Sequence, residues 1–230
     1  MAYLTRSDFI FDDDSFHVTW QCHNQKWLLR WEWSKKLYYD LLLKYKDKYG
    51  VEIYSYNFMD NHLHLSGKLT IREEFSNFFK VVNAQFAKRV NKRLKRKGQV
   101  VMDRFKSPRI KDDDHLLSVM GYIDLNQVRV GKVASPEANR WSSYRYYAYG
   151  MPDPLITPAP TYLGLGRNDK MRQEVYREMV QAIWDADEEM NISHTYFIGD
   201  PDWVSEQYRN LRETLKAKRR KIPPPDEDES

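Results

Sequence analysis

The chain has 230 residues, of which 41% are hydrophobic and 30% are charged, and its formal net charge is +4. This length suits one main domain with an appendage, no apolar run approaches the roughly 20 residues of a membrane-spanning helix, and the first residues lack the apolar segment of a secretory signal. The single Cys22 permits no internal disulfide and suits a reducing compartment, so we expect a cytoplasmic protein without a membrane partner.

Residues 15–70 predict a strand, a helix and a hairpin. SFHVTWQC (15–22) and VEIYSYNFM (51–59) are rich in β-branched and aromatic residues, as strands are. Between them, apolar residues recur at helical spacing over about 34–48. HLHLSGKLT (62–70) then continues as another strand, with a turn at Asp60-Asn61.

His62 and His64 lie two residues apart in the predicted strand 62–70. Strand residues at this spacing point to the same face of a sheet. Both imidazoles are therefore placed to share a divalent metal ion, while Leu63 points the other way into a core. The alternative is a pair of half-buried strand histidines that bind no ligand.

A long amphipathic helix is predicted over about 71–97, followed by a strand at about 101–110. From Lys80 to Ile110 there are eleven Lys or Arg residues and one acid. This density is typical of a polyanion-binding site, whereas acids interleave most solvated helix faces. The candidate residues for binding a polyanion are Lys88, Arg89, Lys92, Arg93, Lys95, Arg96 and Lys97 on the helix, and Arg104, Lys106 and Arg109 on the strand.

HLLSVMGYIDLNQVRVG (115–131) predicts a helix that begins after Asp112–Asp114 and stops at Gly131. Tyr122 and Asn126 are four residues apart, so they share one face of this helix. Presented to the His pair, the Asn126 carbonyl could complete a metal shell and the Tyr122 phenolate could act as a nucleophile. The alternative is a core tyrosine and a capping asparagine.

The rest of the chain predicts a helical extension. RWSSYRYYAY (140–149) predicts a short aromatic helix, 150–166 an irregular connector, and 168–186 a helix. A final helix capped by Asp200 or Asp202 follows. We divide the chain into a main domain (1–150), an accessory helical region (151–222) and a disordered acidic tail (223–230).

The order β-α-β-β-α-β-α predicts an α+β fold. We expect a ferredoxin-like antiparallel sheet with helices on one or both faces, plus the C-terminal helical extension. His62 and His64 should lie on a central strand of this sheet.

Several segments resemble, in order, the motifs of the REP-associated tyrosine transposases, which belong to the single-tyrosine HUH transposases. FHVTWQCHN resembles the first strand of that family, and MDNHLHL its Met-Pro-Asn-His-x-His-Leu segment. RFKSPRI resembles its Arg-Phe/Tyr-Lys-Ser strand, and GYIDLNQVRVGKV followed by RWSSY its Tyr-Ile-x-x-Asn-Pro-Val and Trp-Ser-Ser blocks. The resemblance covers residues 16 to about 150. Asp60 and Gln127 stand where the family usually has Pro, so the loop geometry there should differ.

The resemblance implies a metal-dependent single-stranded DNA endonuclease and strand transferase that acts at hairpin or repeat DNA in transposition. It implies Tyr122 as the nucleophile of a 5′-phosphotyrosine intermediate, and His62, His64 and Asn126 as ligands of Mg²⁺ or Mn²⁺. The protein would act as a monomer or a homodimer.

Two other functions stay open from the sequence. One is a catalytically inactive, domesticated nucleic-acid-binding regulator of the same fold. The other is an RNA-binding ferredoxin-like domain, although the RNP-type aromatic signature is absent. Four aromatic residues are candidates either for base stacking or for the core, namely Phe105, Trp141, Tyr144 and Tyr146.

Overall fold

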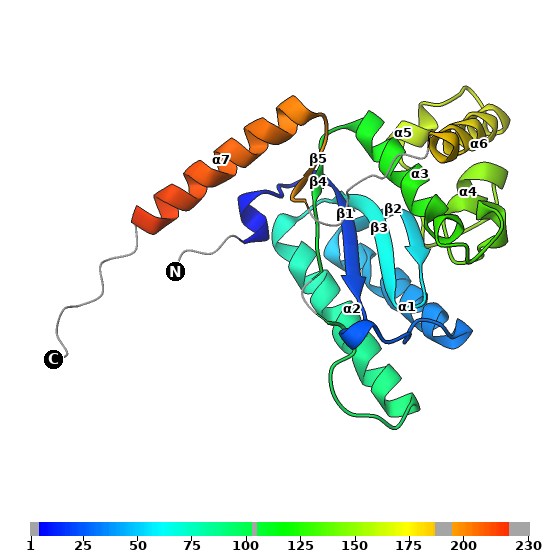
Figure 1. Cartoon of the computed structure of the whole chain (residues 1–230), viewed down its shortest axis with the longest axis horizontal. Coiled ribbons are helices and arrows are strands. Elements are labelled where there is room, and N and C mark those ends of the chain that lie inside the picture. Colours follow the sequence, from blue (N-terminus) through cyan, green and yellow to red (C-terminus); the bar gives the residue numbers. More distant parts are fainter. Residues whose placement is uncertain (1–4, 103–104, 187–194, 221–230) are drawn as a thin grey trace.

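A five-stranded sheet in the order β2-β3-β1-β4-β5 forms the centre of the computed structural model, which describes residues 5–102, 105–186 and 195–220 (Figure 1). Its strands are β1 (Ser15–Gln21), β2 (Val51–Phe58), β3 (His62–Leu69), β4 (Arg109–Ile110) and β5 (Phe197–Ile198). The pairs are antiparallel except for β4 with β5. The predicted α+β class and ferredoxin-like order are confirmed, with the parallel β5 as an addition.

Helices cover both faces of the sheet. The helices are α1 (Glu32–Tyr45), α2 (Arg72–Arg93), α3 (Asp113–Arg129), α4 (Tyr144–Tyr149), α5 (Pro160–Leu163), α6 (Asp169–Asp185) and α7 (Pro201–Arg220), with 3₁₀ turns at Arg6–Asp8, His23–Gln25, Asp47–Tyr49 and Pro136–Ala138. α1 and α2 pack together on one face, α3 lies on the other with α4 to α6 around it, and α7 extends outward from β5 (Figure 1). Within the described residues, no helix combines the length and apolar character needed to span a bilayer.

The face of the sheet that packs on α1 and α2 is apolar. Trp20 of β1 contacts Tyr38 of α1 and Phe86 of α2, with ring centroids 5.2 and 5.9 Å apart. The Trp20 indole N–H donates to the Tyr38 hydroxyl at 2.7 Å, which satisfies this buried donor. Phe16 packs on Phe75 at 4.6 Å. Burial of these rings removes large apolar areas from water and supplies much of the stability of the core.

The opposite face of the sheet is polar and is buried beneath α3. His17 and Thr19 of β1 pair with Ser66 and His64 of β3, and this register places all four side chains on the same face. The Ser66 hydroxyl also forms a hydrogen bond with the Ser55 hydroxyl of β2 at 2.7 Å. Buried polar groups must be paired, so this face restricts which surface can cover it.

The helices expected from the sequence are confirmed with small changes in their ends. The Asp112 carboxylate caps α3 by accepting from the backbone N–H of His115 at 3.1 Å, and Asp200 caps α7 through Trp203 at 3.0 Å. Gly131 adopts a φ of 65° just beyond α3, as a stop residue should. The predicted tail 223–230 lies outside the described residues.

The predicted strand 101–110 is mostly wrong. Of the described residues in this segment, only Arg109–Ile110 forms a strand, and the segment before it makes single bridges from Val101 to Cys22 and from Lys106 to Thr19. Pro108 has no N–H to donate to a ladder, which limits continuous pairing. β5 was not predicted, because a two-residue strand is too short to show alternation.

α6 packs closely against α3 and is joined to it by a buried acid. A Cβ atom at Gly121 of α3 would lie 2.6 Å from Ile183 Cδ1 of α6, so glycine permits the close approach. One turn further, the Asp124 carboxylate accepts from the Ser143 hydroxyl at 2.7 Å and from the Tyr176 hydroxyl at 2.8 Å. Burial raises the pKa of Asp124 to about 7, although these hydrogen bonds oppose the shift.

The raised pKa of Asp124 predicts a pH-dependent stability. Between about pH 4 and pH 7 the unfolded state has lost this proton and the folded state keeps it, so stability falls by up to about 1.4 kcal/mol per pH unit. Asp124→Asn removes this slope. Denaturant unfolding of both proteins from pH 4 to pH 8 should show that the wild-type stability, relative to the variant, declines up to about pH 7 and then levels off. A difference between the two proteins that stays constant from pH 4 to pH 8 would contradict the assignment.

Candidate active site

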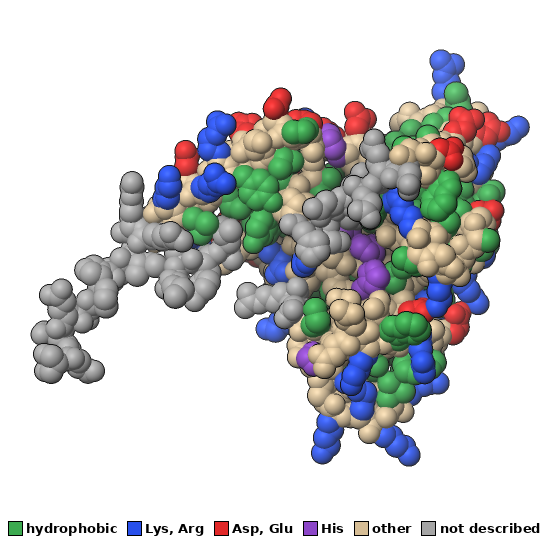
Figure 2. All heavy atoms as spheres, in the orientation of Figure 1, with side chains coloured by type: hydrophobic (Ala, Val, Ile, Leu, Met, Phe, Trp, Pro, Cys, Tyr) green, Lys and Arg blue, Asp and Glu red, His purple; other side chains and the backbone are tan. Residues whose placement is uncertain are grey.

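His62 and His64 project from β3 toward the polar face of the sheet. They pair with Gln21 and Thr19 of β1, so both imidazoles lie on one side of the strand. Their ring centroids are 5.1 Å apart and the rings are nearly perpendicular. Figure 2 shows histidine side chains gathered over the sheet beside α3. The structure therefore brings the two candidate ligands close enough to contact one ion.

His17 orients His64, and sequence analysis did not include it in the site. The His17 Nε2 and His64 Nδ1 atoms are 3.0 Å apart, and the two rings are stacked. When His64 Nδ1 donates this hydrogen bond, its Nε2 lone pair is left to bind a ligand. Burial, with His17 and His62 nearby, holds the pKa of His64 well below its ordinary value, so the imidazole is neutral at pH 7.

His62 is oriented by a hydrogen bond between its Nδ1 and the side chain of the neighbouring Asn61. Its Nδ1 lies 2.7 Å from the Asn61 side-chain oxygen, which can only accept, so Nδ1 carries the proton and Nε2 has the lone pair. Burial lowers the pKa of His62, while Asp60 opposes the shift. Two neutral imidazoles with oriented rings fit a divalent metal ion.

The donor set around this pair is small. Within the described part of the chain, no group of three or more His, Cys, Asp or Glu side chains is placed to hold a metal ion. A metal at the His62 and His64 pair would therefore take other ligands, such as an amide oxygen, water or substrate oxygens. That requirement fits a hard, oxygen-preferring ion that keeps open coordination positions.

α3 is docked on the histidine face by Asn57, a residue that the sequence patterns did not single out. Asn57 of β2 is paired with His64 of β3 and shares its face. Its side-chain N–H donates to the carbonyl of Ile123 in α3 at 2.7 Å, and its oxygen accepts from Asn139 at 3.1 Å. Gln127 adds a hydrogen bond to the backbone carbonyl of Phe58 at 2.9 Å. These bonds fix the position and rotation of α3 over the sheet.

Tyr122 and Asn126 occupy one face of the docked α3. Tyr122 is half-buried, and the Arg129 guanidinium lies over its ring at 4.3 Å from the centroid. Asn126 is 9% exposed, and its amide nitrogen donates to the Ile123 carbonyl at 3.3 Å. That bond leaves the Asn126 oxygen as an acceptor or ligand. The predicted sharing of a face is confirmed, while the roles as nucleophile and third ligand stay predictions.

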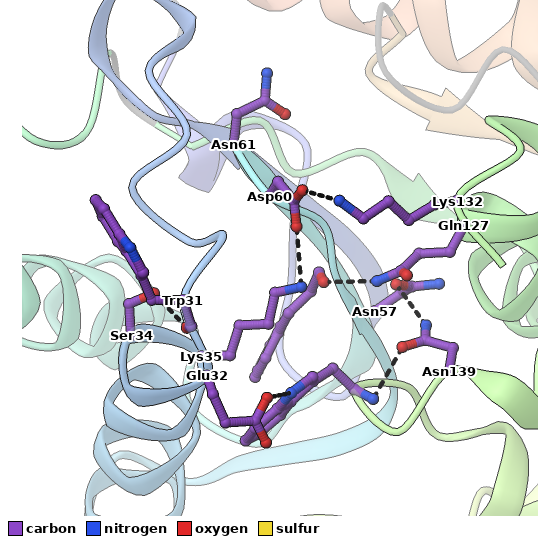
Figure 3. A network of polar contacts seen from close by, with 12 residues as sticks. Trp31, Glu32, Ser34, Lys35, Asn57, Asp60, Asn61, Gln127, Lys132 and Asn139 are labelled. Carbon is purple, nitrogen blue, oxygen red and sulfur yellow. Dashed lines mark hydrogen bonds and ion pairs between the residues drawn. The ribbon is translucent and has the colours of Figure 1, made fainter.

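The hairpin turn before His62 is fixed by an ion-pair network (Figure 3). Asp60 pairs with Lys35 of α1 at 3.1 Å and with Lys132, which follows α3. Burial alone raises the pKa of Asp60, but the hydrogen bonds from Lys132 and Lys35 outweigh it, so its pKa lies below the ordinary value. The backbone carbonyls of Asp60 and Asn61 also accept from Leu29 and Cys22. The turn that presents His62 is thus attached to both helical layers.

The family model of IS200-like transposases matches residues 12–126, which is half of the chain and includes β1 to β4, both histidines and the whole Tyr122 to Asn126 segment. The chain belongs to the family of IS200-like transposases. The resemblance to transposases found in the sequence is therefore confirmed.

A solved structure agrees with this assignment at the level of the fold. It is described as the structure of a REP-associated tyrosine transposase bound to a REP hairpin, and it superposes with a TM-score of 0.56 at 17% sequence identity. The match covers 69% of this chain and 93% of the other. A comparison with curated proteins gives no significant match.

Most of the basic candidates of this transposase lie near the C-terminal end of α2. Figure 2 shows Lys and Arg side chains around the end of α2. Lys88, Arg89, Lys92, Arg93, Lys95 and Lys97 are exposed there, whereas Arg96 is half-buried and donates to the Gln99 carbonyl. The chain then runs along the end of β1, where Met102 donates to the Gln21 carbonyl at 2.8 Å, and Gln21 pairs with His62. The basic segment therefore ends beside β1, the strand that pairs with the histidine-bearing β3.

The three candidates expected on the fourth strand have different surroundings. Lys106 is exposed, and its pairing with Thr19 puts it on the histidine face. Arg109 pairs with Phe16 in register, so it is on the opposite face, and it forms an ion pair with Asp14 at 2.9 Å. Arg109 is thus separated from the histidine face by the sheet, and its contact with DNA stays a prediction. Arg104 lies outside the described residues.

The aromatic candidates divide between core and surface. Phe105 and Tyr144 are buried, with exposures of 7% and 5%, so they are core residues. Tyr146 and Trp141 are half-buried. Trp141 donates from its indole nitrogen to Glu32 at 2.8 Å, which links it to α1.

Removal of the Asp60 carboxylate should loosen the hairpin. Asp60→Ala leaves Lys35, whose side chain is 8% exposed, without its anionic partner and should lower the free energy of unfolding by about 1–3 kcal/mol. The matched variant Asp40→Ala removes an exposed i,i+4 pair with Lys36 and should cost less than about 0.5 kcal/mol.

The same comparison has a defined pH dependence. The pKa of Asp60 is depressed in the folded state, so its contribution is present above its unfolded value and is lost as the pH falls through the folded value. Chemical unfolding at pH 7 and pH 3 should show a smaller effect of Asp60→Ala in acid. Equal losses of unfolding free energy for the Asp60 and Asp40 variants at pH 7 would contradict the role of the Asp60 ion pairs in fixing the hairpin turn.

Proposed function

We propose that this protein is a metal-dependent single-stranded DNA transposase that cleaves and rejoins hairpin or repeat DNA through a covalent tyrosine intermediate. The observation that carries the proposal is the docking of the Tyr122 helix onto the strand face that presents two neutral, oriented imidazoles. Membership of the IS200-like transposase family supports it. The similar fold of a transposase bound to a REP hairpin supports a hairpin as the DNA partner.

Tyr122 is the nucleophile in this proposal. Its phenolic oxygen forms a bond to phosphorus while the bond from phosphorus to the 3′ oxygen breaks. The phenol gives up its proton and the departing 3′ oxygen becomes a hydroxyl, so no oxidant or reductant is needed. A 5′-phosphotyrosine linkage results, and a later attack on it by a 3′ hydroxyl rejoins the DNA and restores Tyr122.

His62, His64 and the Asn126 oxygen are the proposed ligands of Mg²⁺ or Mn²⁺. When bound there, such an ion supplies Lewis-acid polarisation of the phosphate. His17 and Asn61 hold the two imidazoles with their Nε2 lone pairs available. The burial of this face excludes water and strengthens charge interactions within it.

The basic end of α2 is the proposed track of the DNA backbone. Lys and Arg side chains there contact phosphates without regard to sequence, which gives a salt-sensitive affinity. The exposed Lys106 extends this track onto the histidine face.

Formation of a covalent adduct tests the proposed reaction. Labelled single-stranded hairpin oligonucleotides, including repeats that flank the gene, are incubated with the protein and Mg²⁺, Mn²⁺ or EDTA, and separated on denaturing gels. The wild type should form an SDS-stable adduct with metal and none with EDTA. Tyr122→Phe should reduce adduct formation on the order of 10³-fold or more, because it lacks the attacking oxygen.

Tyr149→Phe is the matched control for this experiment, because Tyr149 is an exposed tyrosine on α4. It should form the adduct at the wild-type rate. Tight binding by the wild type across the whole pool without any adduct would reject the catalytic proposal and indicate a non-catalytic DNA-binding protein.

The salt dependence of binding tests the proposed DNA track. Lys88→Ala/Lys92→Ala removes two exposed cations one turn apart near the end of α2. If each contacts a phosphate, the slope of log affinity against log salt concentration should become shallower by about 1.4 for a single strand. Lys36→Ala/Lys44→Ala on α1 is the matched control and should leave the slope unchanged, as measured by fluorescence anisotropy. An unchanged slope in the α2 variant would remove this segment from the track.

A further inference from the structure

Arg129 lies on the same face of α3 as Tyr122 and Asn126. The three residues are at positions i, i+4 and i+7, so they follow one stripe along the helix. The Arg129 guanidinium carbon is 4.3 Å from the centroid of the Tyr122 ring. A permanent positive charge is therefore placed beside the proposed nucleophile.

Arg129 is half-buried, and the two terminal nitrogens of its guanidinium are shielded from solvent. Neither nitrogen has a hydrogen-bond partner among the described residues. Arg129 is the one described arginine whose two terminal nitrogens are both buried and both unpartnered. No ion pair joins it to an acid in the described chain. A buried, unpaired charge is costly, and the face of the Tyr122 ring offsets only part of that cost. The free donors thus indicate a binding site for an anion.

We propose that Arg129 binds the non-bridging oxygens of the DNA phosphate that Tyr122 attacks. The inference rests on the proposed function, because it assumes that the anion is a phosphodiester of the substrate. A guanidinium offers two parallel N–H groups, and the two non-bridging oxygens of a phosphodiester match this fork. Arg129 then stabilises negative charge on the phosphate as the Tyr122 oxygen approaches, so it is a catalytic residue in addition to the metal ligands.

The first test measures anion binding without DNA or turnover. Thermal unfolding of the metal-free protein is followed with inorganic phosphate and with chloride at equal ionic strength. Phosphate should raise the melting temperature of the wild type through binding to the folded state, and this shift should disappear in Arg129→Gln. Arg140→Gln is the matched control, since Arg140 is exposed and paired with Glu32 at 3.0 Å. It should keep the full shift, and an equal shift in Arg129→Gln would overturn the proposal.

The second test measures adduct formation with the oligonucleotide that the wild type cleaves. Arg129→Gln should slow the reaction about 100-fold or more with little change in DNA affinity, comparable to the loss of one oxyanion-stabilising donor. Arg129→Lys keeps the charge but not the fork, and should recover part of the rate. A rate within threefold of the wild type in Arg129→Gln would overturn the assignment. Partial recovery in Arg129→Lys would show that the loss in Arg129→Gln does not come from a folding defect.

The two proposals fail in different ways. Adduct formation that is equal in the wild type and Arg129→Gln retains the tyrosine mechanism and rejects the role of Arg129. If phosphate raises the melting temperature only when Arg129 is present, but the wild type forms no adduct, the anion site is retained and the catalytic function is rejected.

Discussion

The arrangement of the candidate site depends on the hydrogen bonds of Asn57, which join the strand face that carries the histidines to α3. Asn57 is next to His64 on the strand face, donates to the Ile123 carbonyl of α3 and accepts from Asn139. A buried amide is costly when unpaired, so sliding or rotating α3 would leave the Asn57 side-chain N–H without its acceptor. The position of Tyr122 relative to the histidines is consequently set by a polar contact, whereas apolar packing alone would permit several helix positions.

The two departures from the family motif are both used in the structure. Asp60 and Gln127 stand where the resembled transposases usually have Pro, a residue that restrains the backbone through its ring. In this chain Asp60 restrains the hairpin through Lys35 and Lys132, and Gln127 donates to the Phe58 carbonyl. Side-chain bonds to neighbouring elements thus replace a local restraint on φ. The turn that presents His62 and the helix that carries Asn126 remain fixed by different means.

The buried polar groups around the candidate site lower the folding stability of the domain. Buried imidazoles at His17 and His64 and the unpaired guanidinium of Arg129 are poor choices for a core whose only role is to fold. The apolar face with Trp20, Tyr38 and Phe86 offsets this cost on the other side of the same sheet. One layer therefore stabilises the domain, while the other carries the two neutral imidazoles, the Tyr122 phenol and the Arg129 guanidinium.

Alternation and helical periodicity in the sequence determined the main elements, the common face of His62 and His64, and the stripe of Tyr122 and Asn126. These features depend on residues close together along the chain, which is why a single sequence contains them. The contact of His17 with His64, the amide bonds of Asn57 and the location of Arg109 on the far face depend on strand register, which joins residues far apart in sequence. Only the tertiary structure decided these, because a shift of one residue in register sends every side chain of a strand to the opposite face.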